Sequence, residues 1–314
     1  MSEPAIIVDR LTKRFGAFVA VNGLTFDVGR GEVFGFLGAN GAGKSTTIRM
    51  LCGLLTPTSG RAVVGGADVT ADPEAVKRRI GYMSQRFSLY ELLTVAQNIE
   101  FYGALYGLTG ARLEARRAFA LDMAGLKGRE GDLARDLSGG WRQRLALGCA
   151  LLHEPPIIFL DEPTGGVDPI SRRVFWRLID DLSTHGTTIL VTTHYLDEAE
   201  RCDRVAIIHA GRLAALGSTR ELKATFRDRP IVEVRAADAV QAMSVLDRLP
   251  AVEKTSLFGT AVHAVLRDAS TSSETVRAAL ASAGVPVVGI APVVPSLEDV
   301  FIDVVDRVVA EGAA

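Results

Sequence analysis

A glycine-rich stretch that ends in a lysine and a hydroxyl has the residue types that hold the phosphates of a nucleotide. It reads Gly38-Ala39-Asn40-Gly41-Ala42-Gly43-Lys44-Ser45, which is the GxxxxGK[ST] pattern of a P-loop, and Thr46 follows it. An apolar run, 33–37, precedes it and a helix-forming stretch comes next, which is the context that the motif needs. Glycines let backbone N–H groups curl around the phosphates, and the helix N-terminus adds partial positive charge.

Three side chains at the end of this stretch have separate predicted tasks. Lys44 is predicted to reach the β- and γ-phosphates, and the Ser45 hydroxyl to ligate Mg²⁺. Thr46 is predicted to bond another phosphate oxygen. A chance glycine-rich turn does not account for the lysine and the serine together, so the sequence predicts a bound Mg-nucleotide.

Two acids end a second apolar run. Asp161 and Glu162 follow Ile157-Ile158-Phe159-Leu160. Asp161 is predicted to emerge from a buried strand beside Mg²⁺, and Glu162 to polarise the attacking water as a general base. Such a pair is a weak signal alone, and the P-loop upstream makes it a strong one.

Between these motifs lies Leu137-Ser138-Gly139-Gly140, which resembles the signature sequence of ATP-binding cassette (ABC) proteins. The order of the remaining pieces resembles that family over about residues 5–217. Gln85 stands where the Q-loop glutamine would be, and Asp168 belongs to a stretch that resembles the D-loop. His194 resembles the switch histidine and Phe15 the aromatic that stacks on adenine. Taken singly, these residues would be a surface amide, a helix cap, a structural histidine and a core aromatic.

The resemblance implies an ATPase in which two cassettes pair head to tail around two ATP molecules. Ser138, Gly139 and Gly140 would then open a helix toward the γ-phosphate bound by the opposite subunit. Gln85 would contact Mg²⁺ and water, and His194 would hydrogen-bond the γ-phosphate. The second cassette would be another copy of this chain or a related cassette. In the family, the segment equivalent to 86–106 forms a groove for a separate membrane-spanning subunit, although its apolar residues also suit the core of a lobe.

One residue departs from the family pattern. Trp141 stands where the family usually has glutamine after the two signature glycines. Ser138 and Gly140 remain, so we expect hydrolysis to survive. We expect the indole to pack between the lobes.

Strands that alternate with helices predict an α/β domain with a mostly parallel sheet. By resemblance, residues 1–221 form a P-loop NTPase of the ABC ATPase type, with N-terminal antiparallel strands and a helical subdomain at about 86–153. Residues 222–314 show the order βαββαβ plus a helix, which predicts a small α+β domain of ferredoxin-like type. Helices are expected at 44–55, 74–80, 138–153 and 196–202.

Composition narrows the function further. The net charge is -2 and the pI about 6.2, which argues against a nucleic-acid partner. No run of 18 apolar residues is present, so we expect a cytoplasmic chain that lies peripherally on the inner face of the cell membrane. The three cysteines, Cys52, Cys149 and Cys202, are far apart and are expected to be reduced and buried.

The stretch Pro295-Ser296-Leu297-Glu298-Asp299-Val300-Phe301 resembles the ending of ABC-2-type drug-export cassettes. As a purely structural feature, it would be a helix face with Glu298 and Asp299 on the first turn as dipole complements. The favoured hypothesis is the ATPase of an exporter. Soluble cassettes that act on DNA or ribosomes usually have basic extensions, a second cassette or a coiled-coil insertion, and this sequence shows none of these. A regulatory module that does not hydrolyse ATP is disfavoured because Asp161, Glu162 and His194 are all present.

Overall fold

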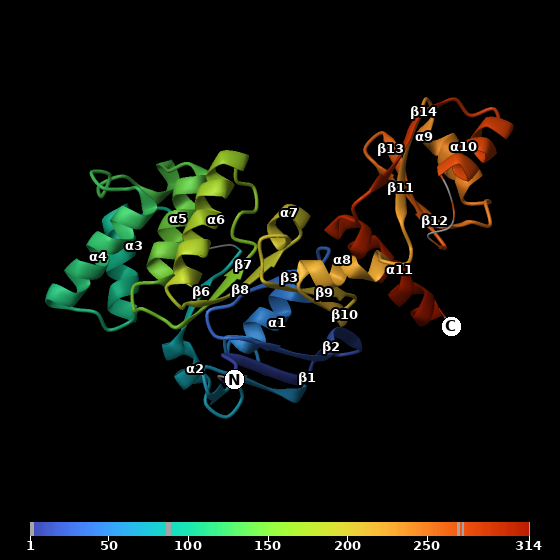
Figure 1. The fold of residues 1–314 in the computed structure, drawn as a ribbon. Helices are drawn as coiled ribbons and strands as arrows, with labels where there is room; N and C mark the ends of the chain where they lie inside the picture. The colour runs from blue at the N-terminus through green and yellow to red at the C-terminus, as the bar shows by residue number, and fades with distance from the viewer. Residues whose placement is uncertain (1–2, 86–88, 269–270, 272, 314) are drawn as a thin grey trace. The chain divides into compact units, whose positions relative to one another are not determined.

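The computed structural model describes residues 3–85, 89–268, 271 and 273–313. The chain divides into two compact units, Met1–Ser218 and Thr219–Ala314, whose elements are labelled in Figure 1. Each unit has a hydrophobic core of its own. Within the part of the chain that is described, no helix combines the length and apolar character required to span a bilayer.

A six-stranded, mostly parallel sheet forms the centre of the first unit. Across the sheet the strands are β10 (Arg212–Gly217), β9 (Arg204–His209), β3 (Val33–Leu37), β8 (Thr188–Thr193), β7 (Ile157–Asp161) and β6 (Ile80–Met83). Only β10 runs antiparallel to its neighbour. Every residue of β3, β7 and β8 is buried, which explains their continuous apolar runs. The loops after β3, β6, β7 and β8 therefore emerge at one edge of the sheet.

A four-stranded antiparallel sheet packs on the same core. Its order is β2 (Phe18–Val28), β1 (Ile6–Phe15), β4 (Ser59–Val64) and β5 (Ala67–Asp68). Phe26 of β2 contacts the rings of Phe34 and Phe36 on β3, with centroids 5.4 and 5.1 Å apart. These aromatic contacts join the two sheets directly. Ile48 of α1 (Lys44–Leu51) belongs to the same apolar cluster, so the helix that follows the P-loop packs on this shared core.

Three helices form a separate lobe, seen together in Figure 1. They are α3 (Val95–Leu105), α4 (Gly110–Ala124) and α5 (Gly139–Ala150), and they enclose their own apolar cluster. Thr94 and Gln97 form a capping box that begins α3. Asp168 begins α6 (Pro169–Thr184), because its side chain accepts the backbone N–H groups of Ile170 and Ser171. The remaining helices of the unit are α2 (Pro73–Arg79), η1 (Ala134–Asp136) and α7 (Leu196–Ala199).

The second unit has the predicted βαββαβ order followed by a helix. The order of its antiparallel sheet is β12 (Val252–Phe258), β13 (Ala261–Leu266), β11 (Ile231–Ala236) and β14 (Val287–Val293). Numbered within the unit this is 2-3-1-4, the ferredoxin-like arrangement. The helices are α8 (Thr219–Lys223), η2 (Ala224–Phe226), α9 (Ala239–Leu246), α10 (Ser273–Ser282) and α11 (Leu297–Ala313). The predicted fold class is confirmed for both parts of the chain.

Two buried acids attach α11 to this sheet. Asp299 accepts a 2.8 Å contact from His263 Nδ1, and both groups are buried. Asp303 is 2% exposed and pairs with Arg229 at 3.0 Å and Lys254 at 2.9 Å. Burial opposes ionisation of Asp303, but hydrogen bonds from Arg229 and Lys254 outweigh it and hold its pKa below the usual value. Asp299 therefore does more than complement the helix dipole, which was the role suggested by its position on the first turn.

Several element limits differ from those expected. The helix after the P-loop ends at Leu51, not residue 55, and the helix after the signature ends at Ala150, not residue 153. Ile80 begins β6 instead of ending α2, and α7 is only four residues long. The three strands 59–64, 67–68 and 80–83 were missed, since none has a clear alternation of apolar and polar residues.

Candidate functional site

The P-loop connects β3 to α1 and presents an open helix start. Gly43, the residue before α1, has φ of 104°, and a Cβ there would lie 2.6 Å from the carbonyl oxygen of Ala20. Only glycine fits this close approach. No side chain caps α1, and its first turn carries no acid. The first backbone N–H groups therefore remain available for an anion.

Lys44 is buried beneath the P-loop, with 4% of its residue surface exposed. Its Nζ donates to the carbonyl oxygens of Gly38 at 2.8 Å and Ala39 at 3.2 Å, and lies 3.1 Å from Glu162 Oε1. The two carbonyls hold the ammonium inside the loop, and the carboxylate compensates its charge.

Ser45 and Asp161 meet at the carboxyl edge of the sheet although 116 residues separate them. The Ser45 hydroxyl lies 3.0 Å from Asp161 Oδ1, which also accepts a 2.7 Å hydrogen bond from Thr192 Oγ1. A hydroxyl and a carboxylate are oxygen ligands of the kind that Mg²⁺ takes together with phosphates and water. The donor set therefore fits the predicted metal.

Glu162 lies at the centre of the predicted catalytic groups. Its Oε2 accepts a 2.8 Å hydrogen bond from Gln85 Nε2 and lies 3.4 Å from His194 Nδ1, while Oε1 faces Lys44. Its backbone has φ of 48°, an unusual conformation for a residue other than glycine. Its N–H donates to the carbonyl and the hydroxyl of Thr192 at the end of β8. Four residues from separate segments are thus brought within contact distance.

A cavity of about 340 Å³ lies over Lys44, Gln85 and Glu162, and His194 is not among its lining residues. Gln85 and Glu162 line it together with the P-loop residues Asn40, Gly41, Gly43, Lys44, Ser45 and Thr46. The aromatic side chain among the lining residues is Phe18, which sequence reasoning missed. Phe15 is not among them: it is 50% exposed and lies under the Lys13 ammonium, 5.2 Å from the ring centroid. The sequence did offer a signal, because Phe18 is a second aromatic residue that follows Phe15 by three positions and was not considered as the adenine-stacking residue.

The signature residues are not brought to this cavity within one chain. Ser138 precedes α5 and is exposed, and its side chain makes no capping hydrogen bond. At Gly140 a Cβ would lie 2.4 Å from Ser171 Oγ, so α5 approaches α6 too closely for a larger residue. Asp168 caps α6 and does not line the P-loop cavity. Hydrogen bonds from Ser171 hold the pKa of its carboxyl below the usual value.

Trp141 packs differently from expectation. Its ring lies against the apolar cluster of the helical lobe, and the Arg129 guanidinium stacks over it at 4.1 Å. The indole is therefore partly buried against the core of the helical lobe, which differs from the expected position between lobes.

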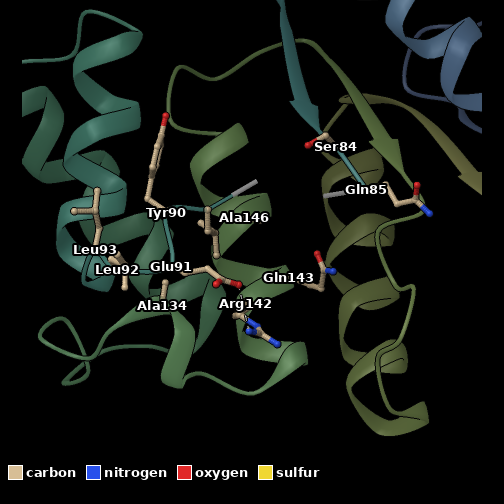
Figure 2. Close-up of a pocket in the computed structure, with 11 residues that line it drawn as sticks. Ser84, Gln85, Tyr90, Glu91, Leu92, Leu93, Ala134, Arg142, Gln143 and Ala146 are labelled. Carbon is tan, nitrogen blue, oxygen red and sulfur yellow. Dashed lines mark ion pairs between the residues drawn. The ribbon is translucent and has the colours of Figure 1, made fainter. Parts of the chain in front are cut away.

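A larger cavity, of about 760 Å³, lies beside the Q-loop (Figure 2). Gln85 and Ser84 line one side, Tyr90, Leu92 and Leu93 the other, and α5 contributes its side chains between them, as Figure 2 shows. Glu91 and Arg142, which also line it, form an ion pair of 3.9 Å. Residues 86–88, which begin the predicted groove segment and the predicted helical subdomain, lie outside the described part of the chain.

Fold and site together define a nucleotide-binding cassette: a P-loop, a Walker B strand and a signature helix on a parallel sheet with a helical lobe. The chain matches the ABC transporter family over residues 21–165, and the family described as ATP-binding protein DrrA1-3-like, C-terminal domain, over residues 217–305. It is 40% identical to the daunorubicin resistance ATP-binding protein DrrA3 of Streptomyces coeruleorubidus, over 100% of both chains. The chain therefore belongs to the family of ABC transporter ATP-binding subunits.

Two further likenesses agree with this membership. The chain is 49% identical to the probable multidrug ABC transporter ATP-binding protein YbhF of Escherichia coli over 71% of its own length, and it spans only 38% of that relative. A solved dimeric cassette, MJ0796 in a post-hydrolysis state with ADP and Pi, superimposes with a TM-score of 0.63 and 26% identity. The match covers 68% of this chain and 98% of that one.

Proposed function

We propose that this chain hydrolyses Mg-ATP at the cavity over the P-loop and powers export through a separate membrane-spanning subunit. The observation that carries the proposal is the convergence of Lys44, Gln85 and His194 on Glu162. Three groups suited to bind a γ-phosphate and its water surround one carboxylate suited to act as the base.

The chain's own residues supply binding, orientation and proton transfer. The P-loop N–H groups and Lys44 bind the phosphates, and an aromatic, Phe15 or Phe18, stacks on adenine. Ser45, Asp161 and Gln85 would hold Mg²⁺, which neutralises charge on the phosphates when it is bound. Glu162 takes a proton from the attacking water, and His194 hydrogen-bonds the γ-phosphate and holds the geometry of attack.

A second cassette completes the site. Ser138, Gly139 and Gly140 stand at an uncapped helix start, where N–H groups bind an anion, and yet they lie apart from their own chain's P-loop cavity. A head-to-tail pair, with another copy of this chain or a related cassette, would bring them to the partner's γ-phosphate. Asp168 would lie at the same interface.

The cavity beside the Q-loop is the proposed docking site for a cytoplasmic helix of the membrane subunit. It has an apolar side, with Leu92 exposed by 73%, and it includes Gln85, which also contacts Glu162. A helix bound in this cavity would contact Gln85 and thereby alter the hydrogen bond from Gln85 to Glu162. A cassette docked in this way would lie peripherally on the cytoplasmic face of the membrane. Export, in place of import, is supported by the drug-resistance relative and the DrrA-like C-terminal match.

Glu162→Gln tests the catalytic assignment. The amide keeps the shape and ATP binding but cannot accept the proton, so turnover should fall by about 10²–10⁴. Steady-state ATP hydrolysis and nucleotide binding are measured on the same preparation. The matched control is Glu114→Gln, an exposed carboxylate on α4 that should leave both unchanged. Normal turnover by Glu162→Gln would contradict the assignment.

Leu92→Glu tests the docking surface. A charge on this exposed apolar side chain should weaken co-purification with the membrane subunit from detergent and should leave the ATP affinity of the free cassette unchanged. Val240→Glu, on a side chain 67% exposed in the second unit, is the control. Full assembly with Leu92→Glu would place the docking site elsewhere.

A further inference from the structure

Glu198 is a buried carboxylate whose two oxygens are each engaged by a different segment. It lies on α7 and is 2% exposed. Its Oε1 accepts a 2.5 Å hydrogen bond from Thr164 Oγ1, and its Oε2 accepts one of 2.7 Å from Thr193 Oγ1. A carboxylate is costly to bury unless its oxygens are bonded, and these two hydroxyls meet that need.

Both threonines adjoin residues of the proposed catalytic site. Thr164 follows Glu162 by two positions, and Thr193 immediately precedes His194. Each threonine is 1% exposed. The Thr193 hydroxyl also accepts the backbone N–H of Tyr195 at 2.9 Å, so the chain on both sides of His194 is held. One carboxylate therefore ties the segment after β7 to the end of β8.

The backbone at Glu162 needs such an anchor. Its φ of 48° is a conformation that persists only when surrounding contacts hold it. On one side, the Glu162 N–H is bonded to the carbonyl and hydroxyl of Thr192. On the C-terminal side of Glu162, the Thr164 hydroxyl, two residues further along the chain, donates to Glu198 and holds the backbone there.

A third segment reaches the same carboxylate. Arg172, on the first turn of α6, places a guanidinium nitrogen 4.0 Å from Glu198 Oε1 and 3.8 Å from Asp197. Its guanidinium also stacks over the Tyr195 ring at 4.4 Å, and the ring of Tyr195 contacts that of His194 at 4.2 Å. The helix that begins at Asp168 is thus connected to the segment carrying His194.

We propose that Glu198 is a positioning residue for ATP hydrolysis. By holding Thr164 and Thr193, it fixes Glu162 and His194 at the 3.4 Å separation seen between their side chains. Glu198 itself does not line the cavity, and among the described residues its hydrogen bonds and ion pairs are to residues outside the P-loop. The proposal rests on the roles proposed for Glu162 and His194.

Glu198→Gln is the primary test, with full-length protein and steady-state ATP hydrolysis. The amide keeps the volume but has one accepting oxygen and one donating NH₂ group, so one of the two bonds must reverse its direction. Both bonds also lose the strengthening that the negative charge gives them, so both anchors are weakened. Displacement of a catalytic group by a fraction of an ångström to 1 Å lowers kcat by roughly 10- to 100-fold. The KM for ATP should change by less than about twofold, because the phosphate-binding groups are untouched.

A second measurement separates positioning from general stability. In a Glu162→Gln background, Glu198→Gln should lower turnover by a much smaller factor than it does in the wild type, since one of the two residues that it positions is already inactive. Thr164→Val should reproduce the kcat loss, and Thr164→Ser, which keeps the hydroxyl, should restore most of it. This threonine pair gives the answer even if Glu198→Gln unfolds. The matched control is Glu200→Gln, an exposed carboxylate at the end of α7, which should leave kcat and KM unchanged.

Three results would overturn the proposal. They are wild-type kcat in folded Glu198→Gln, equal activity of Thr164→Val and Thr164→Ser, and multiplicative losses in the double variant. Failure of the underlying assignment is distinguishable, because it appears as normal turnover in Glu162→Gln alone.

Discussion

The ion pair between Lys44 and Glu162 predicts that one substitution in the nucleotide site lowers stability as well as activity. The two side chains are 4% and 7% exposed, and their charged atoms lie 3.1 Å apart. Lys44→Met removes the ammonium but keeps the length of the chain. Glu162 is then a buried carboxylate whose remaining contacts are Gln85 and His194.

The expected cost follows from this geometry. Removing one partner of a buried pair lowers the free energy of unfolding by about 3–5 kcal/mol. Gln85 still donates to Glu162, so we expect the lower end, about 3 kcal/mol. Glu162→Gln in the same molecule removes the uncompensated charge. The double variant should therefore regain roughly 1–3 kcal/mol relative to Lys44→Met, although it cannot regain hydrolysis.

Urea unfolding followed by tryptophan fluorescence measures this directly. The two tryptophans, Trp141 and Trp176, both lie in the first unit, so the signal reports the unit that contains the pair. Nucleotide is omitted and a chelator is present. The control is Lys77→Met, which removes an exposed partner of Glu74 at 2.7 Å and should cost no more than about 1 kcal/mol. Equal stability of Lys44→Met and wild type, or strictly additive effects of the two changes, would refute the reasoning.

Three other outcomes are expected. Mixing Lys44→Ala with Ser138→Arg, each inactive alone, should restore ATP hydrolysis through one intact composite site, and no recovery in proven mixed dimers would contradict completion by a second cassette. A chain truncated after Ser218, and shown by circular dichroism to be folded, should still bind ATP when binding is measured by calorimetry, because no nucleotide motif lies beyond Ser218. Loss of binding would assign residues 219–314 to the site. For Asp303, whose pKa is lowered, the stabilising contribution is complete above about pH 4, the pKa of unfolded aspartate, and is lost as pH falls through the lower folded pKa. Asp303→Asn should therefore speed hydrogen exchange in β12 and β13 at pH 7 and flatten its acid dependence, and unchanged exchange would show that the ion pairs contribute nothing.

Much of the fold was predictable because its signals are local. The apolar runs of β3 and β7 are continuous, and both strands are buried on both faces. The P-loop and the Walker B acids follow these runs directly, so strand, loop and chemistry occur in one short stretch. The ferredoxin-like order of the second unit was also visible, since apolar strands and helices alternate there at regular intervals. Element ends were less predictable. The helix α5 ends at Ala150, three residues before residue 153, where the prolines at 155 and 156 led us to expect its end.

The sequence by itself determined which groups are predicted to bind phosphate and which acid follows the Walker B strand, because residue type and spacing specify that chemistry. Only the tertiary structure decided how those groups are held. Glu162 faces Lys44, Gln85 and His194 because the ends of four strands meet at one edge of a sheet. The same holds for Glu198, whose partner Thr164 is 34 residues away. A hydrogen bond between such residues depends on strand order and on side-chain direction, and neither has a period or a motif that a linear sequence displays.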